Sequence, residues 1–244
     1  MPEEAEKLPL TQHLEELRGT LFRSLIGLLV GVVAAAFFVN PVLRFLTAPI
    51  GGLQNLYAIE VTETMSVYMR VALLGGLILA LPWIIIQLLA FVSKGLKAGE
   101  RRGIYLVMPF AVLLFLAGVS FAFYVMLPAS LAFFQEIIAV STSIRIKSYI
   151  SFVTNLLFWI GVSFQLPLIF FVLTKVGLVN ARMLIKGWRV AIVVIAVLAA
   201  VITPTGDPIN MIIFMLPLFV LYLLSILLSV MARKTAKPQS EKEN

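Results

Sequence analysis

The chain has 244 residues, of which 61% are hydrophobic and only 13% charged, and its mean hydropathy is +1.05. A soluble domain of this composition would precipitate, so the chain is predicted to be an integral membrane protein. It has no cysteine and a single histidine, His13, which excludes disulfides, thiolate metal sites, the usual metal clusters and His-based catalysis. We therefore expect no metal and no cofactor. The net charge of +7 comes from cations that flank apolar runs, which indicates membrane orientation rather than nucleic-acid binding.

Residues 1–20 are predicted to form a cytoplasmic amphipathic segment. They do not resemble a cleavable signal peptide, because they begin with acidic residues and the first apolar run is long and lacks a small-residue cleavage site. Leucines recur at helical spacing, at Leu10, Leu14, Leu17 and Leu21. On such a helix Glu15 points away from the leucine stripe and is expected to be solvated. Glu16 flanks the stripe and is expected to lie closer to whatever the helix packs against.

Six charge-free apolar runs follow, and each is predicted to cross the membrane as a helix. They are residues 24–43, 71–92, 104–127, 150–173, 190–202 and 209–230. Five of them have about the 17 to 25 residues that a helix needs to cross the hydrocarbon core. The fifth run is shorter and is alternatively half of a buried hairpin. The turn TPTGDP that follows it favours a span, which makes helices five and six a short antiparallel pair.

The positions of the cations predict the orientation. With six spans, fifteen Lys and Arg lie on one side, Arg44, Arg145 and Lys147 lie on the other, and Arg70 enters the second span from that other side. This bias predicts that both termini are cytoplasmic. It also supports an even number of spans, because loss of the fifth span would move the C-terminal cations outside.

The chain is accordingly predicted to be an all-α membrane protein with one polytopic domain, residues 1–244, and a flexible cytoplasmic tail, residues 231–244. The external segments 44–70 and 128–149 contain the apolar stretches LRFLTAPI and SLAFFQEII. We expect these stretches to form short interfacial helices, so that the external loops cap the bundle.

Polar side chains inside the spans are few. No Asp or Glu lies in the six runs, which argues against a proton relay or ion pathway built from intramembrane carboxylates. The remaining polar groups are Gln87, Asn155 and Gln165. Pro167 makes the region of Gln165 the least regular part of the fourth span. Gln165 is interpreted either as part of an interhelical hydrogen bond within the protein or as a docking point for another membrane helix.

Two loops carry further candidates, each with a simple structural role. In LKAGERRGI, residues 96–104, Glu100 is expected at the start of the third helix, where a carboxylate interacts favourably with the helix dipole. Arg101 and Arg102 are consistent with the positive-inside rule alone. Asp207 followed by Pro208 is typical of a helix N-cap with proline at the first helical position.

Six stretches occur in a fixed order along the chain: HLEELR at 13–18, TAPI at 47–50, TE at 62–63, ERR at 100–102, YISFVTNLLFWIGVSFQLPL at 149–168 and TPTGDP at 203–208. Together they resemble the TatC family, the multi-span receptor subunit of the twin-arginine protein translocase. The resemblance extends over nearly the whole chain. Two departures are Lys94, where many members have proline, and TET at 62–64 in place of TEP.

The resemblance implies a receptor that binds twin-arginine signal peptides at its cytoplasmic face. It also implies an oligomeric complex with single-span TatA- and TatB-type subunits, which exports folded proteins across the cytoplasmic (inner) membrane of a prokaryote. Glu16 and Glu100 match the family's two carboxylates that contact the arginines, with Arg18, Arg101 and Arg102 as supporting residues. The residues that match the partner-docking region are Gln165 and Pro167, and those that match external-loop positions are Pro49 and Asp207.

Two other classes of protein fit the sequence less well. A secondary transporter of a small solute needs a polar or charged site near the midplane, for which the spans offer only two glutamines and one asparagine. An intramembrane enzyme needs a cysteine, an acidic pair or a histidine cluster in the bilayer. We therefore expect a receptor subunit that is not an enzyme, with the small-solute transporter as the alternative.

Overall fold

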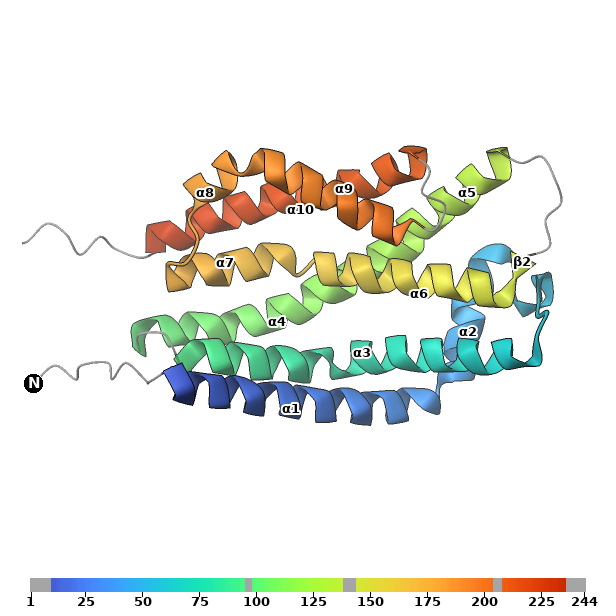
Figure 1. Cartoon of the computed structure of the whole chain (residues 1–244), viewed down its shortest axis with the longest axis horizontal. Helices are drawn as coiled ribbons and strands as arrows, with labels where there is room; N and C mark the ends of the chain where they lie inside the picture. The colour runs from blue at the N-terminus through green and yellow to red at the C-terminus, as the bar shows by residue number, and fades with distance from the viewer. Residues whose placement is uncertain (1–9, 95–97, 138–143, 204–207, 236–244) are drawn as a thin grey trace, which may run out of the picture. The chain divides into compact units, whose positions relative to one another are not determined.

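The computed structural model describes residues 10–94, 98–137, 144–203 and 208–235 (Figure 1). Over these residues the chain is almost entirely helical, with one pair of two-residue strands. Its packing divides it into two compact units: unit 1, residues 1–112 and 142–154, and unit 2, residues 113–141 and 155–244. The division falls inside two of the helices.

The apolar runs form the helices of unit 1, because a segment inside a membrane must satisfy its backbone hydrogen bonds within itself. In chain order the elements of unit 1 are α1 (Leu10–Ala36), α2 (Val39–Thr47), the 3₁₀ turns η1 (Ala48–Ile50) and η2 (Leu53–Asn55), β1 (Leu56–Tyr57), α3 (Val61–Lys94), the first part of α4 (Ala98–Phe121), β2 (Ile144–Arg145) and the first part of α6 (Ile146–Ser163). Unit 1 has two ends. At the end that we call the first end, α1 begins, α3 ends and α4 begins. At the second end, α1 ends, α3 begins and the strands pair (Figure 1).

Glycines let α1 and α3 pack closely side by side. A Cβ added at Gly31 of α1 would lie 2.5 Å from the carbonyl oxygen of Gly76 of α3, and one added at Gly76 would lie 2.5 Å from the Cα of Val32. No larger residue fits at this approach without moving a backbone. Small residues at a helix interface are the usual way in which membrane helices gain van der Waals contact.

Two hydrogen bonds join this pair of helices, one at the middle of α1 and one at its last residue. The indole Nε1 of Trp83 donates to the carbonyl oxygen of Arg23 over 3.0 Å, and the hydroxyl of Tyr68 donates to the carbonyl oxygen of Ala36 over 2.6 Å. The register of α1 against α3 is therefore fixed by both polar and close-packed contacts.

The first predicted span, 24–43, is wrong in its last part. Helix α1 ends at Ala36, a turn follows, and α2 begins at Val39. Pro41 explains the break, since it has no N–H for the carbonyl of Phe37 and its ring would clash with that carbonyl in a continuous helix. The second predicted span, residues 71–92, lies within α3, which starts at Val61 and contains Arg70, as predicted.

The external apolar stretch LRFLTAPI lies in α2 and η1, as a short helix near the second end of unit 1 (Figure 1). Helix α2 packs on α3, and its residue Leu46 accepts a 2.8 Å hydrogen bond from the buried hydroxyl of Tyr149 in α6. Gly51 and Gly52, with φ of 85° and 103°, adopt the left-handed conformations needed to turn the chain towards β1. Strand β1 pairs in parallel with β2, with Leu56 opposite Ile144.

Unit 2 contains the remaining elements. They are the rest of α4, a π-helical segment η3 (Ala122–Met126), α5 (Leu127–Ile137), the rest of α6, α7 (Leu166–Val176), α8 (Ala181–Lys186), α9 (Trp188–Ile202) and α10 (Pro208–Thr235). Helix α10 begins at Pro208, as predicted from the Asp-Pro pair. The predicted tail 231–244 begins inside α10, and residues 236–244 lie outside the described residues.

The stretch SLAFFQEII does not form a separate interfacial helix, so that prediction is wrong. Its described residues belong to α5, which continues α4 through η3. Pro128 explains the π-helical segment, because it cannot donate to the carbonyl of Tyr124, and the N–H of Leu127 bonds instead to Ala122, five residues back.

Close packing and hydroxyl contacts hold unit 2 together. A Cβ added at Gly118 of α4 would lie 2.6 Å from the ring of Phe164. Helices α7 and α10 pack together, and the hydroxyls of Thr174 and Ser229 share a 2.8 Å hydrogen bond between them. The hydroxyl of Tyr222 donates to the carbonyl of Leu184 in α8.

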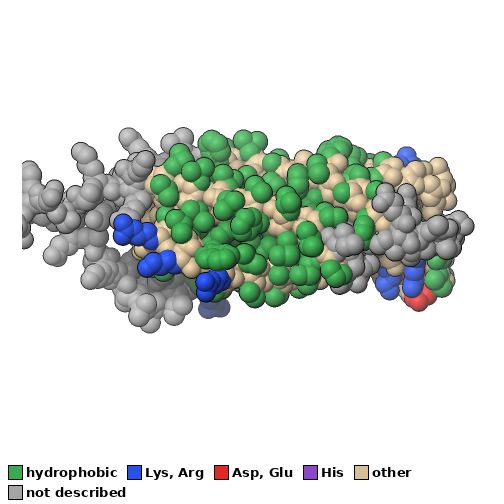
Figure 2. All heavy atoms as spheres, turned by 90° about the horizontal axis from the view of Figure 1, so that it is seen from above, with side chains coloured by type: hydrophobic (Ala, Val, Ile, Leu, Met, Phe, Trp, Pro, Cys, Tyr) green, Lys and Arg blue, Asp and Glu red, His purple; other side chains and the backbone are tan. Residues whose placement is uncertain are grey.

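Five helices of the described chain are long and apolar enough to cross a membrane. They are Glu15–Ala36, Val61–Phe91, Met108–Phe133, Ile146–Val176 and Met211–Ala232. Helix α9, Trp188–Ile202, is a shorter apolar helix. On the face that Figure 2 shows, hydrophobic side chains cover the middle and Lys and Arg side chains lie towards the ends, as expected where an apolar surface meets lipid.

Candidate functional site

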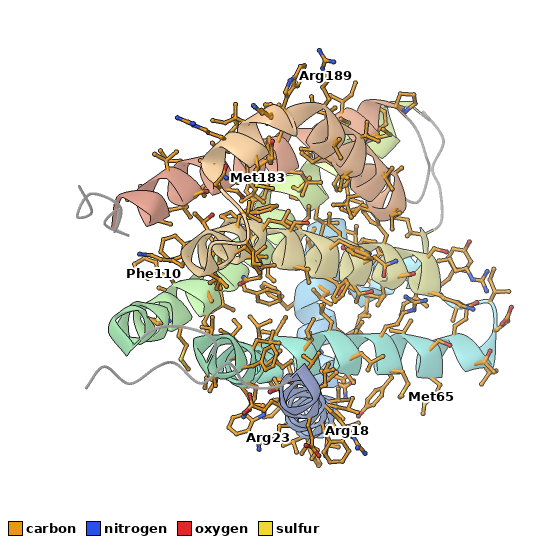
Figure 3. All side chains as sticks on the ribbon, turned by 60° about the vertical axis from the view of Figure 1, so that its left-hand side comes forward. Arg18, Arg23, Met65, Phe110, Met183 and Arg189 are labelled. Carbon is orange, nitrogen blue, oxygen red and sulfur yellow. The ribbon has the colours of Figure 1, made fainter. Side chains whose placement is uncertain are left out.

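Two neighbouring glutamates on α1 differ in their surroundings at the first end of unit 1. Glu15 is exposed, whereas Glu16 is half-buried and its Oε2 atom is shielded from solvent. The prediction that the two carboxylates face different environments is confirmed. Arg18 is exposed on the same helix and points away from the protein (Figure 3). The first end of unit 1 therefore presents one partly enclosed carboxylate and, two residues further along α1, an exposed cation on a different face of the helix.

The second predicted carboxylate lies at the same end of unit 1. Glu100 is the third residue of α4, and Arg101 and Arg102 are the fourth and fifth. This confirms that Glu100 lies at the start of a helix. The side chains of these three residues lie outside the described part of the structure. The starts of α1 and α4 are nevertheless at the same end of unit 1, the first end (Figure 1), so the fold brings both predicted carboxylate positions to one end of unit 1.

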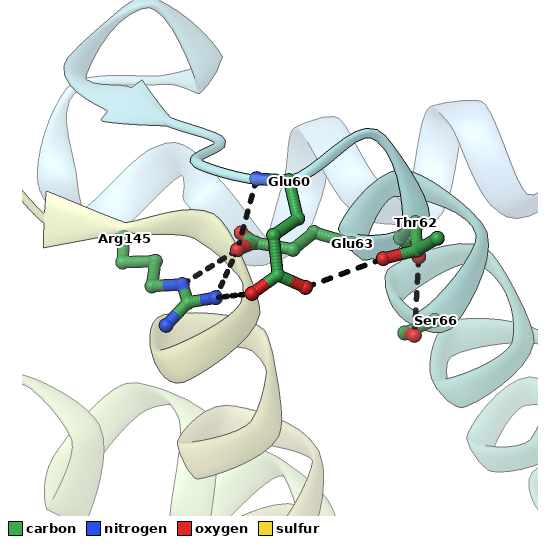
Figure 4. A network of polar contacts seen from close by, with 5 residues as sticks. All are labelled: Glu60, Thr62, Glu63, Ser66 and Arg145. Atoms are coloured by element: carbon green, nitrogen blue, oxygen red, sulfur yellow. Dashed lines mark hydrogen bonds and ion pairs between the residues drawn. The ribbon is translucent and has the colours of Figure 1, made fainter.

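A second polar site, absent from the sequence predictions, lies at the second end of unit 1. Glu63 of α3 is fully buried, and its Oε1 accepts hydrogen bonds from both Nε and Nη2 of Arg145, with the Nε bond at 2.7 Å (Figure 4). Oε1 also accepts the N–H of Glu60 over 3.3 Å, as an acid near a helix start commonly does. Glu60 completes the cluster with a 3.4 Å ion pair to Arg145. The hydrogen bonds and charges of the two carboxylates raise the pKa of Arg145 above its ordinary value.

This Glu60–Glu63–Arg145 cluster joins the start of α3 to β2. The paired residues are 82 positions apart, which is why the sequence did not reveal the contact. The available signal was one of charge: in the predicted topology Arg145 is a cation on the side that the positive-inside rule depletes, and Glu60 and Glu63 are acids on that same side.

The predicted partner-docking residues lie at a break between α6 and α7 in unit 2. Helix α6 ends at Ser163, Gln165 is half-buried in the turn, and Pro167 is the buried second residue of α7. The predicted irregularity of the fourth span is confirmed. Pro167 causes it by withholding an N–H from the carbonyl of Ser163. Gln165 has an interaction within the protein.

Of the two predicted external-loop residues, the structure describes one. Pro49 is exposed in η1, two residues before Gly51. Asp207 lies outside the described residues. Among the residues that the structure describes, no group of three His, Asp or Glu could hold a metal ion.

The fold and the placement of the polar groups define a class of protein. It is a polytopic helical membrane protein whose charged groups gather at the ends of its helices. A family model described as TatC, Sec-independent protein translocase protein, matches residues 12–217. The chain therefore belongs to the TatC family and is a component of the Sec-independent protein translocase, as the sequence motifs predicted.

Individual relatives support the same assignment. The chain is 37% identical to the Sec-independent protein translocase protein TatC of Deinococcus radiodurans, over 99% of this chain and 93% of the relative. It is 38% identical to TatC of Synechocystis sp., over 86% and 83% of the two chains. A crystal structure of a twin-arginine translocase receptor, TatC, superposes with a TM-score of 0.81 at 31% identity, over 91% of this chain and 99% of the other.

Proposed function

We propose that the protein is the receptor subunit of a twin-arginine translocation system and binds twin-arginine signal peptides at the first end of unit 1. The observation that carries this proposal is the half-buried carboxylate of Glu16, which lies at the end where α4 begins with Glu100. The similar crystal structure is described as a twin-arginine translocase receptor. In this proposal Glu16 and Glu100 contact the two arginines.

The chemistry of arginine supports this pairing. A guanidinium binds a carboxylate through two parallel hydrogen bonds, and a receptor for two arginines needs at least two acceptors on one surface. Exposed ion pairs contribute only about 0.2 to 1 kcal/mol each, so the carboxylates supply specificity. The remaining affinity comes from the apolar stretch of the signal peptide against the helices. Arg18, Arg101 and Arg102 support the same face by holding this end on the cytoplasmic side.

We further propose six spans with both termini in the cytoplasm of a prokaryote, so that the chain is one polytopic domain of the cytoplasmic (inner) membrane. Helix α9 is the fifth span in this topology. Its 15 residues extend about 22 Å, less than the roughly 30 Å of a hydrocarbon core, so the bilayer is thinned beside it.

In this role the protein is not an enzyme but organises partners in an oligomeric complex. Single-span TatA- and TatB-type subunits dock near Gln165, where the helix break and Pro167 leave a polar group at membrane depth. Pro49 and Asp207 shape the external loops in this proposal. The exposed position of Pro49 before two left-handed glycines supports such a role.

The test is crosslinking of a twin-arginine signal peptide, and of its twin-lysine version, to membranes that contain wild type, Glu16→Gln or Glu100→Gln. Each substitution should weaken capture of the twin-arginine peptide by about two- to fivefold, the size of one weak ion pair. Glu15→Gln is the matched control and should leave capture unchanged. Equal capture of both peptides by all four proteins would contradict the assignment.

A further inference from the structure

An exposed amide lies at membrane depth on α6. Asn155 is in unit 2, about 14 Å along the helix from Ile146 and inside the apolar segment Ile146–Val176. Its side chain is exposed, and no described residue forms a hydrogen bond with its amide. Another polar side chain of α6 in unit 2 is satisfied by its own helix: the Ser163 hydroxyl donates to the carbonyl of Trp159 over 2.7 Å. Asn155 therefore differs from Ser163 in having no partner within the described chain.

The surface around Asn155 is a narrow strip. The neighbouring residues of α6 are enclosed, with exposed fractions of 0% for Leu156, 2% for Leu157 and 0% for Ile160. On the same side of α6 as Asn155, Ser148 and Val162, each seven residues away, are exposed, Val162 at 37%, and Phe158 and Trp159 are half-buried. The exposed positions therefore form a single line along a helix whose other faces are mostly buried.

Lipid tails cannot satisfy an amide, which has two donors and one acceptor that seek hydrogen-bond partners. A polar group facing hydrocarbon costs free energy, and polar residues inside a membrane usually face another helix or a water-filled cavity. Interhelical hydrogen bonds from Asn and Gln side chains are a common way in which membrane helices recognise one another. The exposed amide therefore favours a partner that brings its own polar side chain into the membrane.

We propose that Asn155 is a contact for the transmembrane helix of a single-span partner subunit that carries a hydrogen-bonding side chain at the same depth. This inference rests on the proposed function and adds a contact to it. Gln165 lies beyond the end of α6 and already has an interaction within the protein, so the two positions are separate contacts. A single helix fits this strip better than a second copy of the chain, because the exposed positions recur every seven residues along one face of α6, the spacing along which one helix packs on another.

The first experiment uses the absence of cysteine from the chain. Asn155→Cys and Val162→Cys are co-expressed with the TatA- and TatB-type subunits of the same organism, each carrying one cysteine scanned through its apolar helix. Both variants should form disulfides with partner positions spaced three or four residues apart. Leu113→Cys, on an exposed position of α4 in the same unit, is the matched control and should form few. Disulfides only between two copies of Asn155→Cys would overturn the choice of partner. Labelling by a water-soluble maleimide without any crosslink would show that water satisfies the amide.

The second experiment compares Asn155→Leu with Asn155→Gln in co-purification of the partner subunits. Loss of the amide in the leucine variant should weaken retention about three- to tenfold, the size of one interhelical hydrogen bond, whereas glutamine should preserve it. If the partners do not co-purify with wild type, the proposed partnership itself fails. If they co-purify equally with wild type and with Asn155→Leu, only the role of Asn155 is contradicted.

Discussion

The most enclosed charge among the described residues is the carboxylate of Glu63, whose position depends on Arg145. In Arg145→Ala the buried carboxylate would lose its counter-ion, which is more damaging than the loss of an exposed pair. We expect a clear fall in the melting temperature of the detergent-solubilised protein, measured by loss of helical circular dichroism. Arg44→Ala, at an exposed arginine near the same end, should have little effect. Equal melting temperatures for the two variants would contradict a stabilising role for the cluster.

The pH dependence of this contact follows from the raised pKa of Arg145. A group whose folded pKa is raised contributes its stability below the ordinary pKa and loses it only as pH rises through the folded value. For an arginine both lie far above neutral pH. The difference in stability between wild type and Arg145→Ala should therefore stay constant from neutral to mildly alkaline pH.

At the scale of single residues, the sequence was informative where the cause is local. The different surroundings of Glu15 and Glu16 follow from helical periodicity alone, because both residues lie on one helix whose leucine stripe is visible in the sequence. The pairing of Glu63 with Arg145 depends on the return of the chain after 82 residues. No periodicity carries that information.

At the scale of elements, the glycines of α1 and α3 make a matched pair of substitutions. Gly76→Ala would place a Cβ against the backbone of Val32, so we expect it to destabilise the protein by about 1 to 3 kcal/mol. Gly19→Ala meets no atom within 4 Å and should be neutral or stabilising by up to about 1 kcal/mol, because alanine favours helix more than glycine does. Reversible unfolding in mixed micelles measures both. Equal effects would show that the helices separate easily at Gly76.

The predictions of where helices are interrupted were right at one proline and wrong at two others. An irregularity near Gln165 was predicted because Pro167 follows it in an otherwise apolar run, and the structure has a break between α6 and α7 there. At Pro41 and Pro128 the predictions were wrong in opposite directions. A continuous span was predicted across Pro41, but a helix ends just before it. A separate helix was predicted after Pro128, but the preceding helix continues past it through a π-helical segment. A proline shows where one hydrogen bond is lost. Whether the helix ends there depends on the residues that pack around it, and the sequence does not show which residues those are.

At the scale of the whole molecule, the number of spans depends on α9, the short apolar helix of 15 residues. Four cations, Arg233, Lys234, Lys237 and Lys242, follow the last span. If α9 did not cross, these cations would lie outside, against the positive-inside rule. We therefore expect a cysteine added after Asn244 to react with an impermeant maleimide only after the cells are permeabilised.

Two exposed positions in the same cysteine-free chain calibrate that measurement. Tyr57→Cys in β1, 42% exposed, should react in intact cells, because the proposed topology places β1 outside. Leu178→Cys, 67% exposed and two residues after the end of α7, should react only after permeabilisation. If the added terminal cysteine instead reacts in intact cells while both calibrating positions behave as expected, α9 does not cross. The protein would then have five spans, and α9 would be half of a hairpin within the membrane, so that the cation bias near the C-terminus would need a different explanation.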